Sequence, residues 1–187
     1  MESREPVYRQ KVAYYTKEVL TFRRKMNLMS FLRLFVFIVL AGEVYYCFRQ
    51  FDYRFIFAIA ITTIVFVMLV FIHSGFSDKK VLYEKLLEIN ANEIAVLNNQ
   101  PSFFSDGLLD GSHESYEEDL DIFGSFSVFH LLNRTTTKPG SAELVRLLSN
   151  PMLDKKNIES YQLAVNMLAP ELDTRQLMTA SGLLRAG

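Results

Sequence analysis

This 187-residue sequence has few of the residues that build metal centres and disulfide frameworks. It contains one cysteine, Cys47, inside an apolar run, so it has neither a disulfide pair nor a zinc-binding cysteine pair. Its histidines, His73, His113 and His130, lack metal-ligand spacing with the cysteine or with one another. We predict no metal site, and no nucleophile–base pair indicates a catalytic residue.

The sequence also lacks a phosphate loop. None of its eight glycines is followed by Lys-Ser or Lys-Thr, the arrangement in which a glycine-rich backbone and a lysine hold nucleotide phosphates. We therefore predict no catalytic and no cofactor-binding residue in this chain.

Two long apolar runs, residues 28–48 and 55–73, are separated by only six residues. A bilayer core about 30 Å thick needs about 20 apolar residues in helical form, and lipid forces such a segment to pair its own backbone groups. The pattern predicts a transmembrane helical hairpin over residues 28–73. The alternative is a buried helical hairpin in a soluble protein.

The first run contains two charged residues, Arg33 and Glu43, both near its ends. A long side chain there can reach the membrane interface. We expect Glu43 to hydrogen-bond Thr62 or Thr63 on the second run, or to pair with Arg54. The alternative is a part in an ion or proton pathway, which two spans alone could hardly build.

Basic residues predict the orientation. They lie before the first run at Arg4, Arg9, Lys11, Lys17, Arg23, Arg24 and Lys25, and after the second at Lys79, Lys80 and Lys85, whereas the connecting loop holds only Arg49 and Arg54, partly offset by Asp52. Because positive charge stays inside, we expect a multi-pass protein of the inner (cytoplasmic) membrane with both termini in the cytoplasm. No small-residue cleavage site follows the first run, so it is predicted to be an anchor and not a signal peptide.

The flanking segments, residues 1–27 and 78–99, are predicted to be cytoplasmic helices. Their seam positions follow steps of four and three residues, at Tyr8, Val12, Tyr15, Val19, Phe22 and Met26 and at Tyr83, Leu87, Asn90, Ile94 and Leu97. Asn90 is a polar position in this otherwise apolar seam. The two seams predict an antiparallel stalk about 30 Å long, at 1.5 Å per residue. The alternative is two helices that lie separately on the membrane surface.

The charge of the rest is uneven, although the net charge is −1. Residues 101–121 hold seven acidic residues and no Lys or Arg. We interpret residues 100–118 as an acidic linker, since the acids lack the spacing of a calcium loop. Residues 119–187 read as short helices: an apolar helix with Phe126, Phe129 and Leu132, a second capped by Thr137, a third capped by Asp154, and a last one over about 173–184.

Residues 119–151, DLDIFGSFSVFHLLNRTTTKPGSAELVRLLSNP, combine an apolar helix, an Asn-x-Thr-x-Thr turn ending in glycine, a leucine-rich helix and a proline. The positions are Asn133, Thr135, Thr137, Gly140, Leu144, Leu148 and Pro151. This segment resembles the start of the core (lever) domain of MutS-type mismatch-repair ATPases. The sequences EINANEIAVLN and Asp106-Gly107 upstream, and NIESYQLAVNML downstream, resemble a membrane-anchored branch of that family. That branch has His-Pro-Tyr before Asp-Leu-Asp, whereas this chain has HESY at residues 113–116.

The resemblance implies an all-α chain made of a two-span transmembrane hairpin (28–48 and 55–73), a cytoplasmic helical stalk, and the beginning of a helical core/lever domain at 119–187. It implies a fragment of a membrane-tethered mismatch-repair-like protein that lacks the ATPase and clamp parts. ATP and magnesium would belong to that missing ATPase, a homodimer would form through missing domains, and DNA is expected as a ligand only at family level. The bilayer is the predicted partner of this chain. The alternative is a small two-span structural or adaptor protein whose helical cytoplasmic region binds other proteins.

Overall fold

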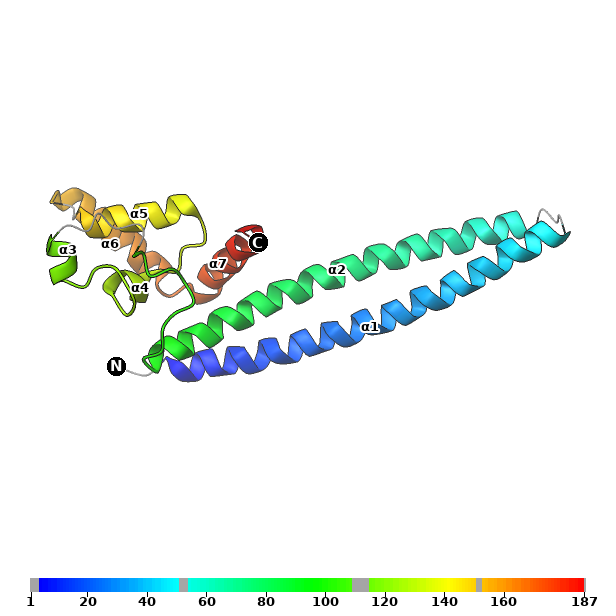
Figure 1. The fold of residues 1–187 in the computed structure, drawn as a ribbon, viewed down its shortest axis with the longest axis horizontal. Coiled ribbons are helices and arrows are strands. Elements are labelled where there is room, and N and C mark those ends of the chain that lie inside the picture. The colour runs from blue at the N-terminus through cyan, green and yellow to red at the C-terminus, as the bar shows by residue number, and fades with distance from the viewer. Residues whose placement is uncertain (1–3, 51–53, 109–114, 151–152, 187) are drawn as a thin grey trace. The chain divides into compact units, whose positions relative to one another are not determined.

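The computed structural model describes residues 4–50, 54–108, 115–150 and 153–186, and its regular elements within these ranges are all helical. They are α1 (Glu5–Gln50), α2 (Arg54–Leu97), α3 (Ser115–Asp119), α4 (Val128–Leu132), α5 (Lys138–Ser149), α6 (Lys155–Leu168) and α7 (Leu172–Ala186) (Figure 1). The predicted all-α fold is confirmed.

The chain divides into two compact units. One unit, here called the hairpin, is Tyr14–Glu84. The other, here called the head, is Met1–Ala13 together with Lys85–Gly187. The helices α1 and α2 both run through the boundary, so each contributes residues to both units.

Within the hairpin, α1 and α2 lie side by side in opposite directions (Figure 1). Ring centroids are 5.9 Å apart for Tyr15 and Tyr83, and 6.5 Å apart for Phe37 and Phe66. The residue number on α2 falls as the number on α1 rises, which defines an antiparallel pair. Phe22 lies between these contacts and packs against two α2 rings, as the next paragraph describes.

The side chains that face the partner helix repeat in steps of four and three residues. On α1 these buried or half-buried positions are Tyr15, Val19, Phe22, Met26, Met29, Arg33, Val36, Leu40, Glu43 and Cys47. On α2 they are Ile59, Thr62, Phe66, Leu69, His73, Phe76, Lys80 and Tyr83. Phe22 anchors the seam, with its ring 5.6 Å from Tyr83 and 6.0 Å from Phe76. The coiled-coil period that we predicted only outside the spans continues through them. The cytoplasmic side of this stalk stays a prediction.

The outer surface of the hairpin is apolar and exposed. Phe31, Phe57 and Phe71 each leave 70% or more of their surface uncovered. Both α1 and α2 contain a segment long and apolar enough to cross a membrane, and almost none of either segment is buried inside the protein. A core helix of a soluble protein hides such side chains from water, so the exposed apolar belt favours a membrane span over the buried-hairpin alternative.

The expected hydrogen bond inside the membrane hairpin is present. The Thr62 hydroxyl donates to Oε1 of Glu43 over 3.1 Å, whereas Thr63 bonds the carbonyl of Ile59 in its own helix. The other carboxylate oxygen, Oε2 of Glu43, is buried without a partner among the described residues. The predicted alternative partner, the Arg54 side chain, lies outside what the structure describes.

Helix ends follow the predicted signals. The helix α2 ends at Leu97, and Asn99 follows with a φ of 55°, a left-handed conformation that asparagine tolerates better than most residues. Thr137 caps α5 by accepting a hydrogen bond from the Gly140 amide, and Asp154 caps α6 in the same way through Asn157. These cap predictions are confirmed.

Our prediction for the first short helix of the head was wrong in detail. Phe126 was expected on its apolar face, but it precedes the helix with a φ of 63° and is exposed. The true cap is Ser127, whose hydroxyl accepts from the His130 amide. Of the expected apolar face only Phe129 is buried, because Leu131 and Leu132 point away from the core. The buried face of this helix is Ser127, His130 and Asn133 together with Phe129. It lies one residue later in the sequence than the face that we predicted.

The region expected to be an acidic linker is partly packed. Phe104 is buried, and Gly107 adopts a φ of 71° against the ring of Phe129. A Cβ atom at position 107 would lie 2.7 Å from Cδ1 of Phe129. The linker contains a short helix as well, α3, and residues 109–114 lie outside the described ranges. A solvated linker therefore fails to describe residues 102–107.

Candidate functional site

The head is held together by buried polar side chains, and these define its candidate site. The sequence predicted no catalytic, cofactor or metal residue here. Among the described residues no group of three His, Cys, Asp or Glu side chains is placed to bind a metal ion. His73 and His130 fall in different units, and His113 lies outside the described ranges. The site is therefore built from amides, hydroxyls and arginines.

A reciprocal amide pair joins α2 to α7. Asn90 is fully buried, and its Nδ2 donates to Oε1 of Gln176 over 3.2 Å while Nε2 of Gln176 donates back to Oδ1 over 2.8 Å. Nδ2 also donates to the carbonyl of Leu86 over 2.7 Å. Buried amides need such partners, because an unpaired buried polar group costs about 1–3 kcal/mol. Asn90, predicted as a polar position in an apolar seam, is paired with a residue 86 positions away.

The Asn-x-Thr-x-Thr turn is tied by its own side chains. Oδ1 of Asn133 accepts from the Thr135 amide over 2.9 Å and from the Thr135 hydroxyl over 2.7 Å. Nδ2 of Asn133 donates to the carbonyl of Ser105 over 2.9 Å, so the same residue fastens the turn to the chain that follows α2. The residues that carry the family resemblance thus have a local structural role.

His130 and Asn92 hold the segment that follows α2. Nδ1 of His130 accepts from the Phe126 amide, which leaves Nε2 to donate to the carbonyl of Ser102 over 3.0 Å. Oδ1 of Asn92 accepts from the Phe103 amide over 2.8 Å. Both ring nitrogens of His130 are occupied by structural bonds, so this histidine is not available as a base or metal ligand.

Arg134 links the turn back to α2. Its Nε lies 2.5 Å from Oε1 of Glu93, and a second guanidinium nitrogen lies 3.2 Å from Oε2. The guanidinium also lies 5.5 Å from the centre of the Phe104 ring. Two parallel bonds to one carboxylate are the strong arrangement for arginine, and they fix the orientation of the turn on the head.

Outside this core, Lys11 on α1 pairs with Asp173 on α7, and other charges pair along single helices. Arg146 makes two hydrogen bonds to the Glu143 carboxylate on α5, and these bonds lower the pKa of Glu143 and raise the pKa of Arg146. Both side chains are exposed to solvent, so the pair contributes little to stability. In the hairpin, burial and the neighbouring Tyr14 and Glu18 raise the pKa of Tyr83.

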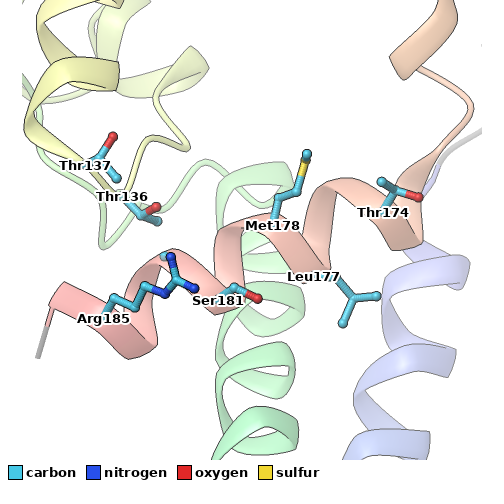
Figure 2. Close-up of a pocket in the computed structure, with 8 residues that line it drawn as sticks. Thr136, Thr137, Thr174, Leu177, Met178, Ser181 and Arg185 are labelled. Carbon is cyan, nitrogen blue, oxygen red and sulfur yellow. The ribbon is translucent and has the colours of Figure 1, made fainter.

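A pocket of about 600 Å³ opens between α7 and the loop before α5 (Figure 2). Thr136 and Thr137 line it from the loop. The residues that line it from α7 are Thr174, Leu177, Met178, Ser181, Gly182 and Arg185. Gly182 permits the close approach of the loop, because a Cβ there would lie 2.7 Å from Cβ of Thr136. No acidic residue is among the described residues that line this pocket.

The helix α6 exposes its whole length. All of its residues are exposed, including Tyr161, Leu163, Val165 and Met167. The helix was predicted from its apolar period. Leu163, Val165 and Met167 each leave more than 60% of their surface exposed. An apolar helix face without cover is the kind of surface that binds another protein element.

Sequence reasoning missed several of these residues. Gln176, Arg134 and the pairing of His130 with Ser102 left no local pattern, because each bond joins residues that are distant in the chain. The one available signal was Asn90, an amide at an apolar seam position, which indicates a buried polar partner without identifying it.

In comparisons with known proteins, no family model matches the chain, and no curated protein or solved structure matches it either. The resemblance to MutS proteins therefore rests on the quoted sequence motifs alone.

Proposed function

We propose that this protein is a membrane-tethered member of the MutS family, in which the hairpin is the anchor and the head is the beginning of the core/lever domain. The observation that carries the proposal is the turn at Asn133–Thr137. Its family-like residues act together: Asn133 binds Thr135, and Thr137 caps α5. This turn joins α4 to α5 and fixes the start of α5 through the Thr137 cap.

In this proposal the chain itself contributes anchorage and connection. ATP and magnesium would bind an ATPase whose phosphate loop this sequence lacks, and DNA would be a ligand only of the whole family member. We expect this chain alone to bind neither ATP nor mismatched DNA tightly. Its residues from Asp119 onward hold seven basic and seven acidic side chains, whereas tight DNA binding needs several uncompensated phosphate contacts.

The gene itself tests the family proposal. Sequencing the genomic DNA past the codon for Gly187 will show an open frame with a phosphate-loop motif if the proposal is right. A stop codon directly after Gly187 would overturn it. The test does not depend on how this chain behaves when it is purified.

The proposed topology places both termini on the cytoplasmic side of the inner membrane. The basic residues that flank the hairpin support this orientation. In a Cys47→Ser background, an Asp52→Cys variant should react with a membrane-impermeant maleimide in intact cells, and a Lys156→Cys variant should not. Labelling of Lys156→Cys from outside, with none of Asp52→Cys, would reject the orientation.

A second candidate function is a two-span adaptor, and the exposed apolar face of α6 favours it. The two proposals differ in what covers α6. A photo-crosslinking residue at Val165 should bond to the same polypeptide in a longer family member, whereas in an adaptor it should bond to a different protein. The control position is Lys156, an exposed charged residue on the same helix.

A further inference from the structure

The pocket beside α7 has a polar end and an apolar wall. Figure 2 shows Arg185 and Ser181 toward the end of α7 that lies beside Thr136 and Thr137, with Met178 and Leu177 nearer the N-terminal end of this helix. The volume of about 600 Å³ suits a small organic ligand, since such sites commonly span about 300–1,000 Å³. The pocket lies entirely within the head and is independent of the membrane anchor.

The donors at the polar end have no side-chain partner in the part of the chain that the structure describes. The guanidinium of Arg185 and the hydroxyls of Thr136 and Ser181 make no side-chain hydrogen bond to any described residue. The other arginines of the loop and of α5 are engaged: Arg134 binds Glu93, and Arg146 binds Glu143. Among the described residues Arg185 therefore has no counter-ion, and it lines the pocket together with the hydroxyl side chains of Thr136 and Ser181.

The charge and geometry select for an anion. No acidic residue is among the described residues that line the pocket, so the field of Arg185 is not neutralised there. The hydroxyl of Thr137 accepts from the Gly140 amide, so its own O–H remains to donate, and it stands at the N-terminus of α5, where the helix dipole favours negative charge. Donors from two elements, the loop before α5 and α7, line the same pocket.

A phosphate monoester matches this set better than a carboxylate. Its three terminal oxygens accept hydrogen bonds from several directions and carry nearly two charges at pH 7, while a guanidinium binds two of them in its planar fork. A carboxylate presents two coplanar oxygens and one charge, so fewer acceptor positions remain for the hydroxyls of the loop and of α7 once the arginine is bound.

The apolar wall specifies the rest of the ligand. Leu177 and Met178 leave 46% and 68% of their surface exposed beside the polar end. A bare phosphate ion would leave the side chains of Leu177 and Met178 in contact with water. We propose that the pocket binds a phosphate monoester with an apolar body, its phosphate on Arg185, Ser181 and Thr136 and its apolar part on Leu177 and Met178.

The same chemistry is found in a soluble phosphate ester and in the headgroup of phosphatidic acid. The full chain in phosphatidylcholine nanodiscs, with its methionine methyls labelled with ¹³C, reports on the pocket through Met178, whose resonance is assigned with a Met178→Leu variant. One arm titrates phenyl phosphate, with benzyl alcohol as the uncharged control. The other arm replaces part of the phosphatidylcholine with phosphatidic acid.

A soluble ligand predicts a saturable shift of the Met178 methyl with phenyl phosphate and none with benzyl alcohol. A lipid ligand predicts that phosphatidic acid shifts the same methyl and that phenyl phosphate then competes. In both arms Arg185→Gln should weaken binding about tenfold or more, because it removes the charge-assisted hydrogen bonds to the phosphate. Ser181→Ala should weaken it about fivefold through the loss of one neutral bond.

Lys156→Gln is the matched control, since it removes one positive charge from exposed α6 and leaves the pocket intact. Its affinity should equal that of the unmodified chain. Two results would overturn the proposal: a Met178 methyl that moves in neither arm, or a Lys156→Gln variant that weakens binding as much as Arg185→Gln does. Unchanged amide exchange in Arg185→Gln shows that the head is still folded.

Discussion

The hairpin and the head are both helical, yet different forces hold them. The side chains most deeply buried in the hairpin are apolar: Tyr15, Phe22 and Leu69. In the head the buried apolar residues are Leu86, Ile89, Phe104, Ile122, Phe129 and Ala180, and the buried polar ones are Asn90, Asn92, Glu117, Ser127, His130, Asn133 and Gln176. Polar residues are thus as common as apolar ones in the core of the head.

This difference separates two ways of specifying a structure. The hairpin uses a seam of mostly apolar side chains that repeats in regular steps, and its outer surface suits lipid. The head has too small an apolar core to fix its shape, so individual hydrogen bonds fix the arrangement of α2, α4 and α7. Single substitutions should therefore be tolerated in the hairpin and damaging in the head.

The largest expected effect is the loss of Phe129, whose side chain is fully buried. Phe129→Ala should destabilise the head by about 3–5 kcal/mol, because it removes a large apolar side chain and leaves a cavity. Hydrogen–deuterium exchange of the chain in nanodiscs measures this as lost protection in α2 after Lys85 and in α7.

Phe31→Ala is the matched control in the hairpin, where the ring is 72% exposed. Protection of the head should remain at the level of the unmodified chain. An equal loss of protection in both variants would show that the stability of the head does not depend specifically on its own buried core.

Gly182→Ala should give the next largest effect. An added Cβ would approach Cβ of Thr136 to 2.7 Å, so the loop before α5 must move away from α7. Overpacking of this kind costs about 1–3 kcal/mol, more than the gain of about 1 kcal/mol that alanine brings to a helix. Thermal unfolding of the head measures it. Gly42→Ala, in a span with nothing within 4 Å of the new atom, should show no loss.

The amide pair between α2 and α7 allows a test of the polar core itself. Gln176→Leu should destabilise the head by about 1–3 kcal/mol, because Asn90 stays buried and loses both of its bonds to Gln176. The double variant Asn90→Leu with Gln176→Leu should recover most of that loss, since no buried polar group is then left unpaired. A double variant less stable than Gln176→Leu would mean that the pair does more than satisfy its own amides.

The sequence predicted what is local or periodic. Helix caps at Thr137 and Asp154, the end of α2, and the two spans follow from nearest neighbours or from repeated spacing. The bonds from Arg134 to Glu93 and from Asn133 to Ser105 could not be predicted, because they depend on which turns meet in space. Phe126 shows that prediction can also fail locally. Its position matched the apolar period of α4, but it has a positive φ and lies before the helix begins.

The smallest effect is expected inside the hairpin, at the bond between Thr62 and Glu43. Thr62→Val keeps the shape of the side chain and removes the hydroxyl that donates over 3.1 Å. Hydrogen bonds between membrane helices contribute about 0.6 kcal/mol on average, and the ring contacts of Phe22 and Phe37 remain. The pairing of α1 with α2, followed by disulfide trapping between cysteines at Val36 and Phe66, should fall by less than about threefold. A complete loss of pairing would place Glu43 among the residues that fix the hairpin, and the contrast between an apolar hairpin and a polar head would no longer hold.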